Sequence, residues 1–194
     1  MTHAMMPDLP LRLASDGLRL RPEVPADAGF VQHLYEAVRW PELEPTGWPD
    51  AVKHAFLADQ FRLQSRHYAQ FYRDALFLIV ERAGEPIGRL YLHRGPSDHR
   101  IVDISLLPAS RGRGIGGGLL DMVSEEAAGL GRTVSIHVEV FNPARNLYER
   151  KGFRQIGESG PYLLMEWRPA TAARAGWEGA PARGPAVTAQ GLPT

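Results

Sequence analysis

The chain has 194 residues, of which 44% are hydrophobic and 23% are charged, a mixture typical of a globular protein. Lys and Arg together number 22, as do Asp and Glu, so no overall charge favours nucleic acid or anionic lipid. The absence of cysteine excludes a disulfide framework, a thiolate metal site and a cysteine nucleophile. Because the basic and acidic residues balance, we expect no nucleic-acid partner.

The hydrophobic pattern predicts neither a membrane span nor a secretory signal. The longest uninterrupted apolar run covers residues 75–80, whereas a helix needs about 20 apolar residues to cross a bilayer. The first ten residues lack a cationic region followed by a long apolar stretch. We expect a cytoplasmic protein without membrane contact.

Composition divides the chain into three regions. Residues 1–10 have the character of a flexible leader, and residues 11–168 carry the periodic patterns of one folded domain. Residues 169–194 are mostly Ala, Pro and Gly, and a segment with so little to bury cannot recover its ordering entropy. We predict that this tail is disordered.

The first half of the domain is predicted to contain one strand and two helices. Leu18–Arg21 predicts a short strand, and apolar residues at helical spacing over Phe30–Val38 predict a helix capped by Asp27. Three prolines and a glycine predict a loop over Trp40–Asp50. Stacked apolar pairs then predict a second helix over Ala51–Ser65.

From residue 75 onward the hydrophobic period changes to that of strands. Strands are predicted over residues 75–82, 87–93, 101–107 and 133–140, helices over 116–129 and 142–151, and a last hairpin over 153–167. One strand–helix–strand unit, residues 101–140, thus lies inside an otherwise meandering sheet. This order predicts an α/β fold (an α+β mixed sheet) with helices on both faces.

The most informative segment is the glycine-rich turn between the strand 101–107 and the helix that follows. Its glycines are Gly112, Gly114, Gly116, Gly117 and Gly118. They let successive backbone N–H groups face one concave side, and the helix start leaves its first amides unpaired. Arg111 and Arg113 add charge-assisted donors. The turn is therefore a candidate receptor for a phosphate or a pyrophosphate.

Three other interpretations of this turn are weaker. A P-loop needs Lys and then Ser or Thr after its glycines, and here Ile115 follows Gly114. A dinucleotide fingerprint is formally present at Gly112, Gly114 and Gly117, but its first glycine should follow the strand directly and several βαβ units should repeat. A turn without any ligand would order many glycines at a cost in backbone entropy.

Two segments share a characteristic spacing. The first is Arg111-x-x-Gly114-x-Gly116 after a strand, and the second runs from Asn142 to Phe153 on the next strand–helix unit. Together they resemble the GNAT superfamily of acyl-CoA-dependent N-acetyltransferases. The resemblance implies a GNAT-like fold, with a central mostly antiparallel sheet in which one parallel strand pair splays apart and helices lie on both faces.

The resemblance also implies an activity and a set of cofactor-binding residues. The enzyme would transfer an acetyl group from acetyl-CoA, its co-substrate, directly to a primary amine of a small molecule or peptide, and no metal is expected. The residues implied to bind acetyl-CoA are Leu106, Leu107, Arg111, Gly112, Arg113, Gly114, Ile115, Gly116, Gly117 and Asn142. A backbone amide at the end of the first splayed strand would polarise the thioester carbonyl. The alternative function is that of a non-catalytic acyl-CoA-binding regulatory module. The sequence is compatible with a monomer or a homodimer.

This chemistry needs an acid and a base. The leaving thiolate has a pKa of about 8.5 and takes a proton, and Tyr148 matches the position of that acid in the family. An alkyl amine with a pKa of about 10 must lose a proton before it attacks. Asp103 is the first candidate for the base, with a salt bridge to an arginine as the alternative, and His93, His137 and Glu139 are further candidates.

The acceptor amine is expected against the first two helices and the loop between them. The segment Trp40–Asp50 mixes aromatic with acidic side chains, a combination that suits a cation. The alternative is a solvated loop with its aromatic side chains turned inwards. His67, Tyr68, Phe71 and Tyr72 are expected either in the same cleft or in the core.

Overall fold

The computed structural model describes residues 5–170, which form a mixed sheet with helices on both faces. Within these residues the sheet has seven strands in the order β1-β2-β3-β4-β5-β7-β6. The strands are β1 (Leu18–Pro22), β2 (Leu76–Arg82), β3 (Glu85–Arg94), β4 (Asp98–Leu106), β5 (Thr133–Glu139), β6 (Arg154–Ser159) and β7 (Tyr162–Trp167). The helices are α1 (Leu11–Ser15), α2 (Ala28–Leu43), α3 (Asp50–Phe71), α4 (Ile115–Gly129) and α5 (Arg145–Arg150), with 3-10 turns at Pro25–Asp27, Glu44–Thr46 and Pro108–Ser110.

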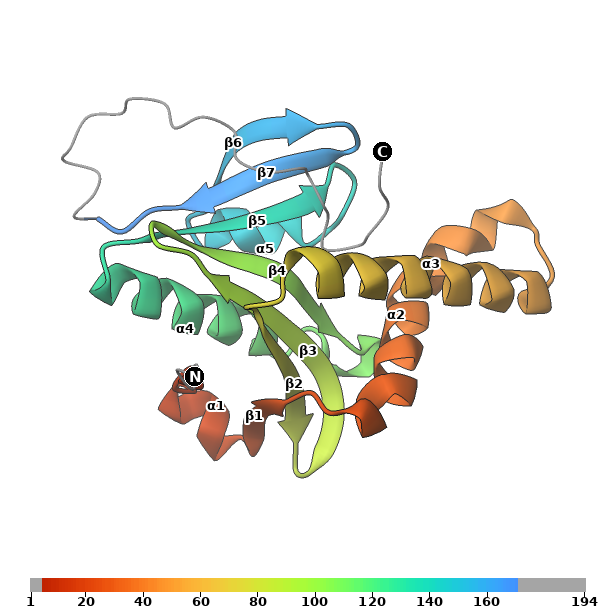
Figure 1. Ribbon diagram of the computed structural model, residues 1–194, viewed down its shortest axis with the longest axis horizontal. Coiled ribbons are helices and arrows are strands. Elements are labelled where there is room, and N and C mark those ends of the chain that lie inside the picture. Colours follow the sequence, from red (N-terminus) through yellow and green to blue (C-terminus); the bar gives the residue numbers. More distant parts are fainter. Residues whose placement is uncertain (1–4, 171–194) are drawn as a thin grey trace.

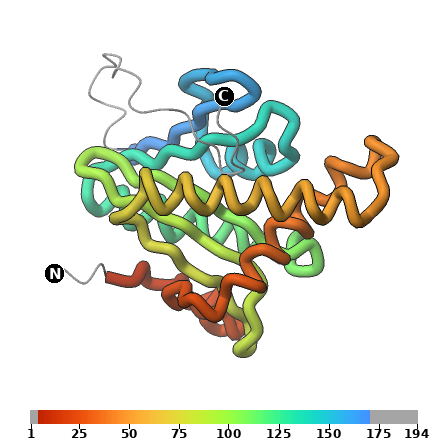
Figure 2. Tube along the Cα trace, turned by 45° about the vertical axis from the view of Figure 1, so that its right-hand side comes forward, coloured from red at the N-terminus to blue at the C-terminus, as the bar shows by residue number. Residues whose placement is uncertain are grey.

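The helices divide between the two faces of the sheet. Figure 1 shows α3 crossing one face and α4 lying along the other, and Figure 2 shows the same crossing from a second direction. The α2–α3 hairpin also extends beyond the edge of the sheet in both views. No helix between residues 5 and 170 is long and apolar enough to cross a membrane.

The predicted mixed sheet is confirmed. Every neighbouring pair of strands is antiparallel except β4 and β5, which pair in parallel over only Asp98–Ile101 and Thr133–Ile136. Both strands continue beyond this short ladder, so they splay apart toward their carboxyl ends. A β-bulge places both Val102 and Asp103 after the Leu92–Ile101 pair, with Asp103 opposite Tyr91.

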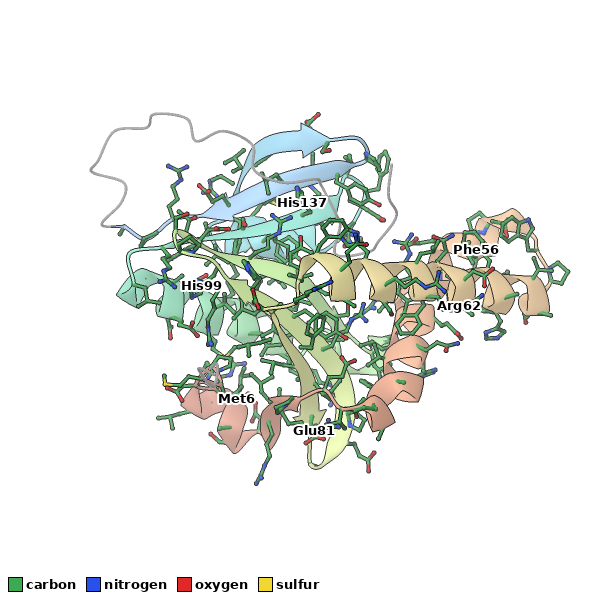
Figure 3. All side chains as sticks on the ribbon, in the orientation of Figure 1. Met6, Phe56, Arg62, Glu81, His99 and His137 are labelled. Atoms are coloured by element: carbon green, nitrogen blue, oxygen red, sulfur yellow. The ribbon has the colours of Figure 1, made fainter. Side chains whose placement is uncertain are left out.

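The two faces of the sheet differ in polarity. The strict alternation along β5 places Val134, Ile136 and Val138 in the main core. Ser135 and His137 therefore point to the opposite face, which α2 and α3 cover, and Figure 3 shows His137 on β5. One face thus supplies the hydrophobic core, and the other carries polar and titratable side chains.

The N-terminal segment packs on the core. Residues 5–10, which the sequence pattern assigns to a flexible leader, have no regular secondary structure, yet Met6 and Leu9 contact the main hydrophobic cluster. The next turn of chain forms α1, whose Leu13 is buried. Single apolar residues in a short irregular segment leave no periodic signal, so the sequence did not predict this contact. The predicted disorder of residues 169–194 falls almost wholly on residues 171–194, which lie outside the described residues.

The loop predicted over Trp40–Asp50 is wrong for most of its length. Helix α2 continues through Pro41 to Leu43, and a 3-10 turn over Glu44–Thr46 follows. Pro41 lies in the last turn of α2, where its missing N–H removes only one helical hydrogen bond. Packing of α2 against α3 stabilises the helix despite the proline. Helix α3 also runs six residues beyond the predicted end at Ser65, because Tyr68 is buried against β3 and β4.

Candidate active site

A cleft of about 1040 Å³ opens where β4 and β5 separate. The ends of the two strands, the glycine-rich turn and the first residues of α4 line one end of it. Helix α5 and the carboxyl half of α2 also line it. The cleft therefore joins a phosphate-binding turn to the helices on the polar face of the sheet.

Two glycines give the turn its shape. Gly112 and Gly114 adopt the left-handed conformation, with φ of +73° and +78°, and Gly114 is the N-cap of α4. The N–H groups of Ile115, Gly116 and Gly117 have no acceptor within the helix because they belong to its first turn. These donors and the positive end of the helix dipole face the cleft together.

The structure brings most of the predicted cofactor-binding residues together. Those on the wall of the cleft are Leu106, Arg111, Gly112, Gly114, Ile115, Gly116, Gly117 and Asn142. Leu107 and Arg113 are not on this wall, and their contact with the cofactor stays a prediction. The N–H of Leu107 donates to the carbonyl oxygen of Ile87 on β3 at 2.8 Å, and Arg113 is exposed on the outside of the turn.

The amide of Leu106 faces the gap between the splayed strands. Adjacent residues of a strand direct their N–H groups to opposite sides, and that of Leu107 points to β3. The N–H of Leu106 therefore points toward β5. Gly88 permits this close pairing, because a Cβ there would come 2.6 Å from Cδ2 of Leu106.

Arg111 holds the turn against the end of β4. Its Nε donates to the carbonyl oxygen of Leu106 at 3.0 Å, and burial lowers the pKa of its guanidinium. Asn142 fixes the turn on the other wall, where its Oδ1 accepts a hydrogen bond from the N–H of Ala144 at 2.9 Å just before α5. Both side chains thus position backbone that lines the cleft.

Tyr148 on α5 is suited to donate a proton. It lines the cleft with 5% of its surface exposed, and its ring packs 6.0 Å from that of Phe153. Burial raises the pKa of the Tyr148 phenol above its ordinary value, and the charge of Asp103 adds to the effect. The phenol is therefore neutral and protonated at neutral pH.

Asp103 does not line the cleft, and the alternative interpretation of this residue, a salt bridge, is what the structure contains. Its carboxylate is fully buried, and Oδ2 lies 2.6 Å from Nη2 of Arg89 and 3.2 Å from the Tyr68 hydroxyl. A carboxylate bound to a buried guanidinium cannot touch an acceptor amine directly. Its other oxygen, Oδ1, accepts a hydrogen bond from Oγ of Ser105 at 2.7 Å, and Ser105 does line the cleft.

The other base candidates are engaged elsewhere or distant. The guanidinium of Arg100 contacts Nδ1 of His137, so this ring nitrogen is already engaged. Glu139 is paired with Arg39 at 2.8 Å. His137 and Glu139 line the cleft, whereas His93 does not.

Two carboxylates on the wall of the cleft, Glu42 and Glu139, share one arginine. Arg39 on α2 pairs with Glu139 at 2.8 Å and with Glu42 at 2.9 Å, so this trio carries one net negative charge. Burial raises the pKa of Glu42, and Arg39 opposes the shift. Of the predicted acceptor segment, only Pro41 and Glu42 reach the cleft, and Tyr68 belongs to a core cluster instead.

Sequence reasoning missed several residues of the cleft wall. Among them are Arg12 on α1, the side chain of Ser105 on β4 and Lys151 after α5. Lys151 lies beside the turn and pairs with Asp121 of α4 at 2.5 Å. No local pattern distinguishes Arg12, because it reaches the turn only through the packing of the N-terminal helix. Among residues 5–170 no cluster of His, Asp and Glu side chains could hold a metal ion.

The mixed sheet, with one parallel pair that splays beside a glycine-rich helix start, is the GNAT-like fold that the resemblance implies. The comparison with family models is more specific, since residues 73–155 match the model described as an acetyltransferase (GNAT) domain. The matched residues include both motifs, so the resemblance inferred from them is confirmed. No curated protein shows significant sequence similarity to the chain.

Solved structures share the fold at low sequence identity. The chain is similar to the PaiA N-acetyltransferase of Thermoplasma acidophilum in complex with coenzyme A (18% identity, TM-score 0.59), over 78% of this chain and 98% of that one. It is also similar to the ribosomal-protein-S18-alanine N-acetyltransferase of Escherichia coli (15%, TM-score 0.52), over 83% and 99%. A GNAT family acetyltransferase of Elizabethkingia anophelis with acetyl-CoA bound matches over 79% and 99% (18%, TM-score 0.51).

Proposed function

We propose that the chain transfers an acetyl group from acetyl-CoA directly to a primary amine of a small molecule or peptide. The observation that carries this proposal is the cleft itself, which joins unpaired backbone donors at the glycine turn to a buried phenol on α5. Two of the similar structures contain coenzyme A or acetyl-CoA, which supports the same cofactor here.

The residues of the cleft fit this cofactor. Glycines at 112, 114, 116 and 117 leave room beside the amides of the turn, and the helix dipole adds positive potential there, as a diphosphate requires. Arg111 adds a guanidinium beside them, and the edge of β4 from Ile104 to Leu106 offers backbone groups to the pantetheine arm. When bound, acetyl-CoA supplies a thioester that an amine attacks, with a thiol as the leaving group.

Two groups of the chain act on the thioester end. The N–H of Leu106, directed into the gap, donates to the carbonyl oxygen and stabilises the negative charge that develops there. The neutral Tyr148 hydroxyl gives its proton to the departing thiolate. Because burial raises the pKa of this phenol, it keeps its proton until a thiolate forms.

The proton of the amine leaves through Ser105. The hydroxyl of Ser105 lies on the cleft wall and already donates to Oδ1 of Asp103. It can accept the amine proton while it passes its own proton to the carboxylate. Asp103 thereby serves the reaction without contact with the amine, and Arg89 holds it in place.

The acceptor end favours a cationic amine. Glu42 and Glu139 outnumber Arg39 there, and an acceptor amine arrives largely as an ammonium ion at neutral pH. Excess negative charge on this part of the cleft wall attracts such an ion before it loses its proton. A cytoplasmic location and the state of assembly, monomer or homodimer, stay predictions.

Calorimetry followed by a thiol-release assay tests the proposal. The expected result is saturable binding of acetyl-CoA, then release of CoA thiol with at least one member of a panel of primary amines, and a product heavier by one acetyl group. Binding without turnover across the panel would favour the regulatory module instead. Stabilisation by a dinucleotide but not by CoA would favour a nucleotide-binding protein.

A further inference from the structure

We infer that Arg12, on the helix that precedes the first strand, is a diphosphate-binding residue of the cofactor cleft. This inference rests on the proposed function, because it assigns a side chain to the same cofactor. It extends the phosphate site from the glycine turn to the N-terminal helix, which is far from the turn in sequence. The helix α1 thus becomes part of the active site.

The position of α1 is fixed by a contact that only glycine permits. A Cβ added to Gly118 on α4 would lie 2.8 Å from Cδ1 and 3.1 Å from Cγ of Leu13. Leu13 is 3% exposed, so its whole side chain is seated in this hollow. The segment before it is also attached, since the Arg94 guanidinium donates to the carbonyl oxygen of Met5 at 2.5 Å. Figure 3 shows Met6 beside α1.

The packing of Leu13 against Gly118 places Arg12 over the glycine turn. Nη2 of Arg12 would lie 3.0 Å from a Cβ built on Gly114, the left-handed N-cap of α4. Both residues line the cleft, as does Pro10 at the start of α1. The guanidinium therefore faces the same space as the unpaired amides of Ile115 and Gly116.

Charge supports the assignment. Within residues 5–170, Lys151 beside the turn is paired with Asp121, whereas Arg12 has no carboxylate within ion-pair distance. An exposed guanidinium held over backbone N–H groups without its own counter-ion is suited to bidentate contact with a phosphate. The location over Gly114, at the centre of the turn, favours the diphosphate over the 3′-phosphate of the cofactor.

Titration calorimetry with CoA and with 3′-dephospho-CoA tests the assignment on purified full-length protein. Arg12→Ala should weaken both ligands by about tenfold, the typical effect of losing one charge-assisted contact. Arg12→Lys should restore part of the affinity. The matched control is Arg19→Ala, which removes an equal charge from the exposed side of β1 outside the cleft and should leave both affinities unchanged.

Three other results of the calorimetry would contradict the assignment of Arg12 or the proposed function. A loss for CoA alone, with 3′-dephospho-CoA unaffected, would move Arg12 to the 3′-phosphate and overturn the diphosphate assignment. Equal affinities in Arg12→Ala and Arg19→Ala would overturn any contact of Arg12 with the cofactor. If the unmodified chain binds neither ligand, the proposed function itself has failed, which separates the two results. Unchanged melting temperatures of the ligand-free variants will show that the fold is intact.

Discussion

Oγ of Ser105 donates to Oδ1 of Asp103 at 2.7 Å, and this hydrogen bond connects a fully buried carboxylate to the wall of the cleft. The other oxygen of Asp103 is bound to Arg89, so the carboxylate is held in one orientation. A serine between a cleft and a buried carboxylate can carry a proton inward without exposing the ion pair. The relation makes the route of the amine proton testable.

Ser105→Ala should lower kcat by about 10²-fold, in the range typical of losing a general acid–base step. The affinity for CoA should stay unchanged, because the hydroxyl faces Asp103 and not the glycine turn. Steady-state kinetics and calorimetry on one preparation separate the two effects. Ser97→Ala, on an exposed turn, is the control and should match the unmodified enzyme. A variant of Ser105 with full kcat would eliminate the relay.

Tyr148→Phe should lower kcat by about 10²-fold while the KM for acetyl-CoA changes little, because the ring still packs against Phe153. Since burial raises the pKa of the phenol, Tyr148 stays protonated beyond pH ~10, the usual value for Tyr. The unmodified enzyme should therefore gain activity with rising pH as the amine loses its proton, without an alkaline decline up to that pH. Tyr35→Phe, buried outside the cleft, is the control. A decline below pH ~9 would show that the phenol is not kept neutral.

Glu42→Gln should raise the KM for a cationic amine several-fold and leave the affinity for CoA unchanged, because Glu42 lies at the acceptor end. Burial raises the pKa of Glu42, so the carboxylate is neutral below that pKa and attracts the amine only above it. The KM of the unmodified enzyme should thus fall as pH rises through this range, and the variant should lose that part of the dependence. Glu44→Gln, exposed on the next turn and outside the cleft, provides the comparison. Equal KM values for the two variants would remove Glu42 from the acceptor site.

Gly118→Ala should make the protein less stable than Gly129→Ala by about 1–3 kcal/mol, as is typical of overpacking. Both glycines belong to α4, so in each variant an alanine replaces a helical glycine. Only at Gly118 does the new Cβ meet Leu13, whereas nothing lies within 4 Å of a Cβ at Gly129. Urea unfolding monitored by circular dichroism measures the difference. If the two variants are equally stable, α1 yields freely and is not fixed as the structure indicates.

Local sequence patterns predicted most helices and strands, because the hydrophobic periodicity of each element lies within its own short segment. The alternation of β5 and the glycines between β4 and α4 are of this kind. The two wrong predictions, the loop that begins at Trp40 and the helix end at Ser65, have a different origin. Pro41 argues locally against helix, and the stacked apolar pairs that indicate the second helix end before Ser65. Packing of α2 on α3 and of Tyr68 on the sheet extends both helices beyond these points.

The features of the candidate site also separate into those predicted from local sequence and those set by tertiary contacts. The sequence by itself determined the glycine turn, the resemblance to the GNAT superfamily and, through that resemblance, the choice of Tyr148 as the candidate acid, because the two motifs depend on residue types at short spacing. Only the tertiary structure decided that Asp103 pairs with Arg89, that Ser105 stands between it and the cleft, and that Arg12 reaches Gly114. The residues in these contacts are brought together by the sheet register, a β-bulge and the packing of Leu13 on α4. A local sequence pattern contains no information about such tertiary contacts.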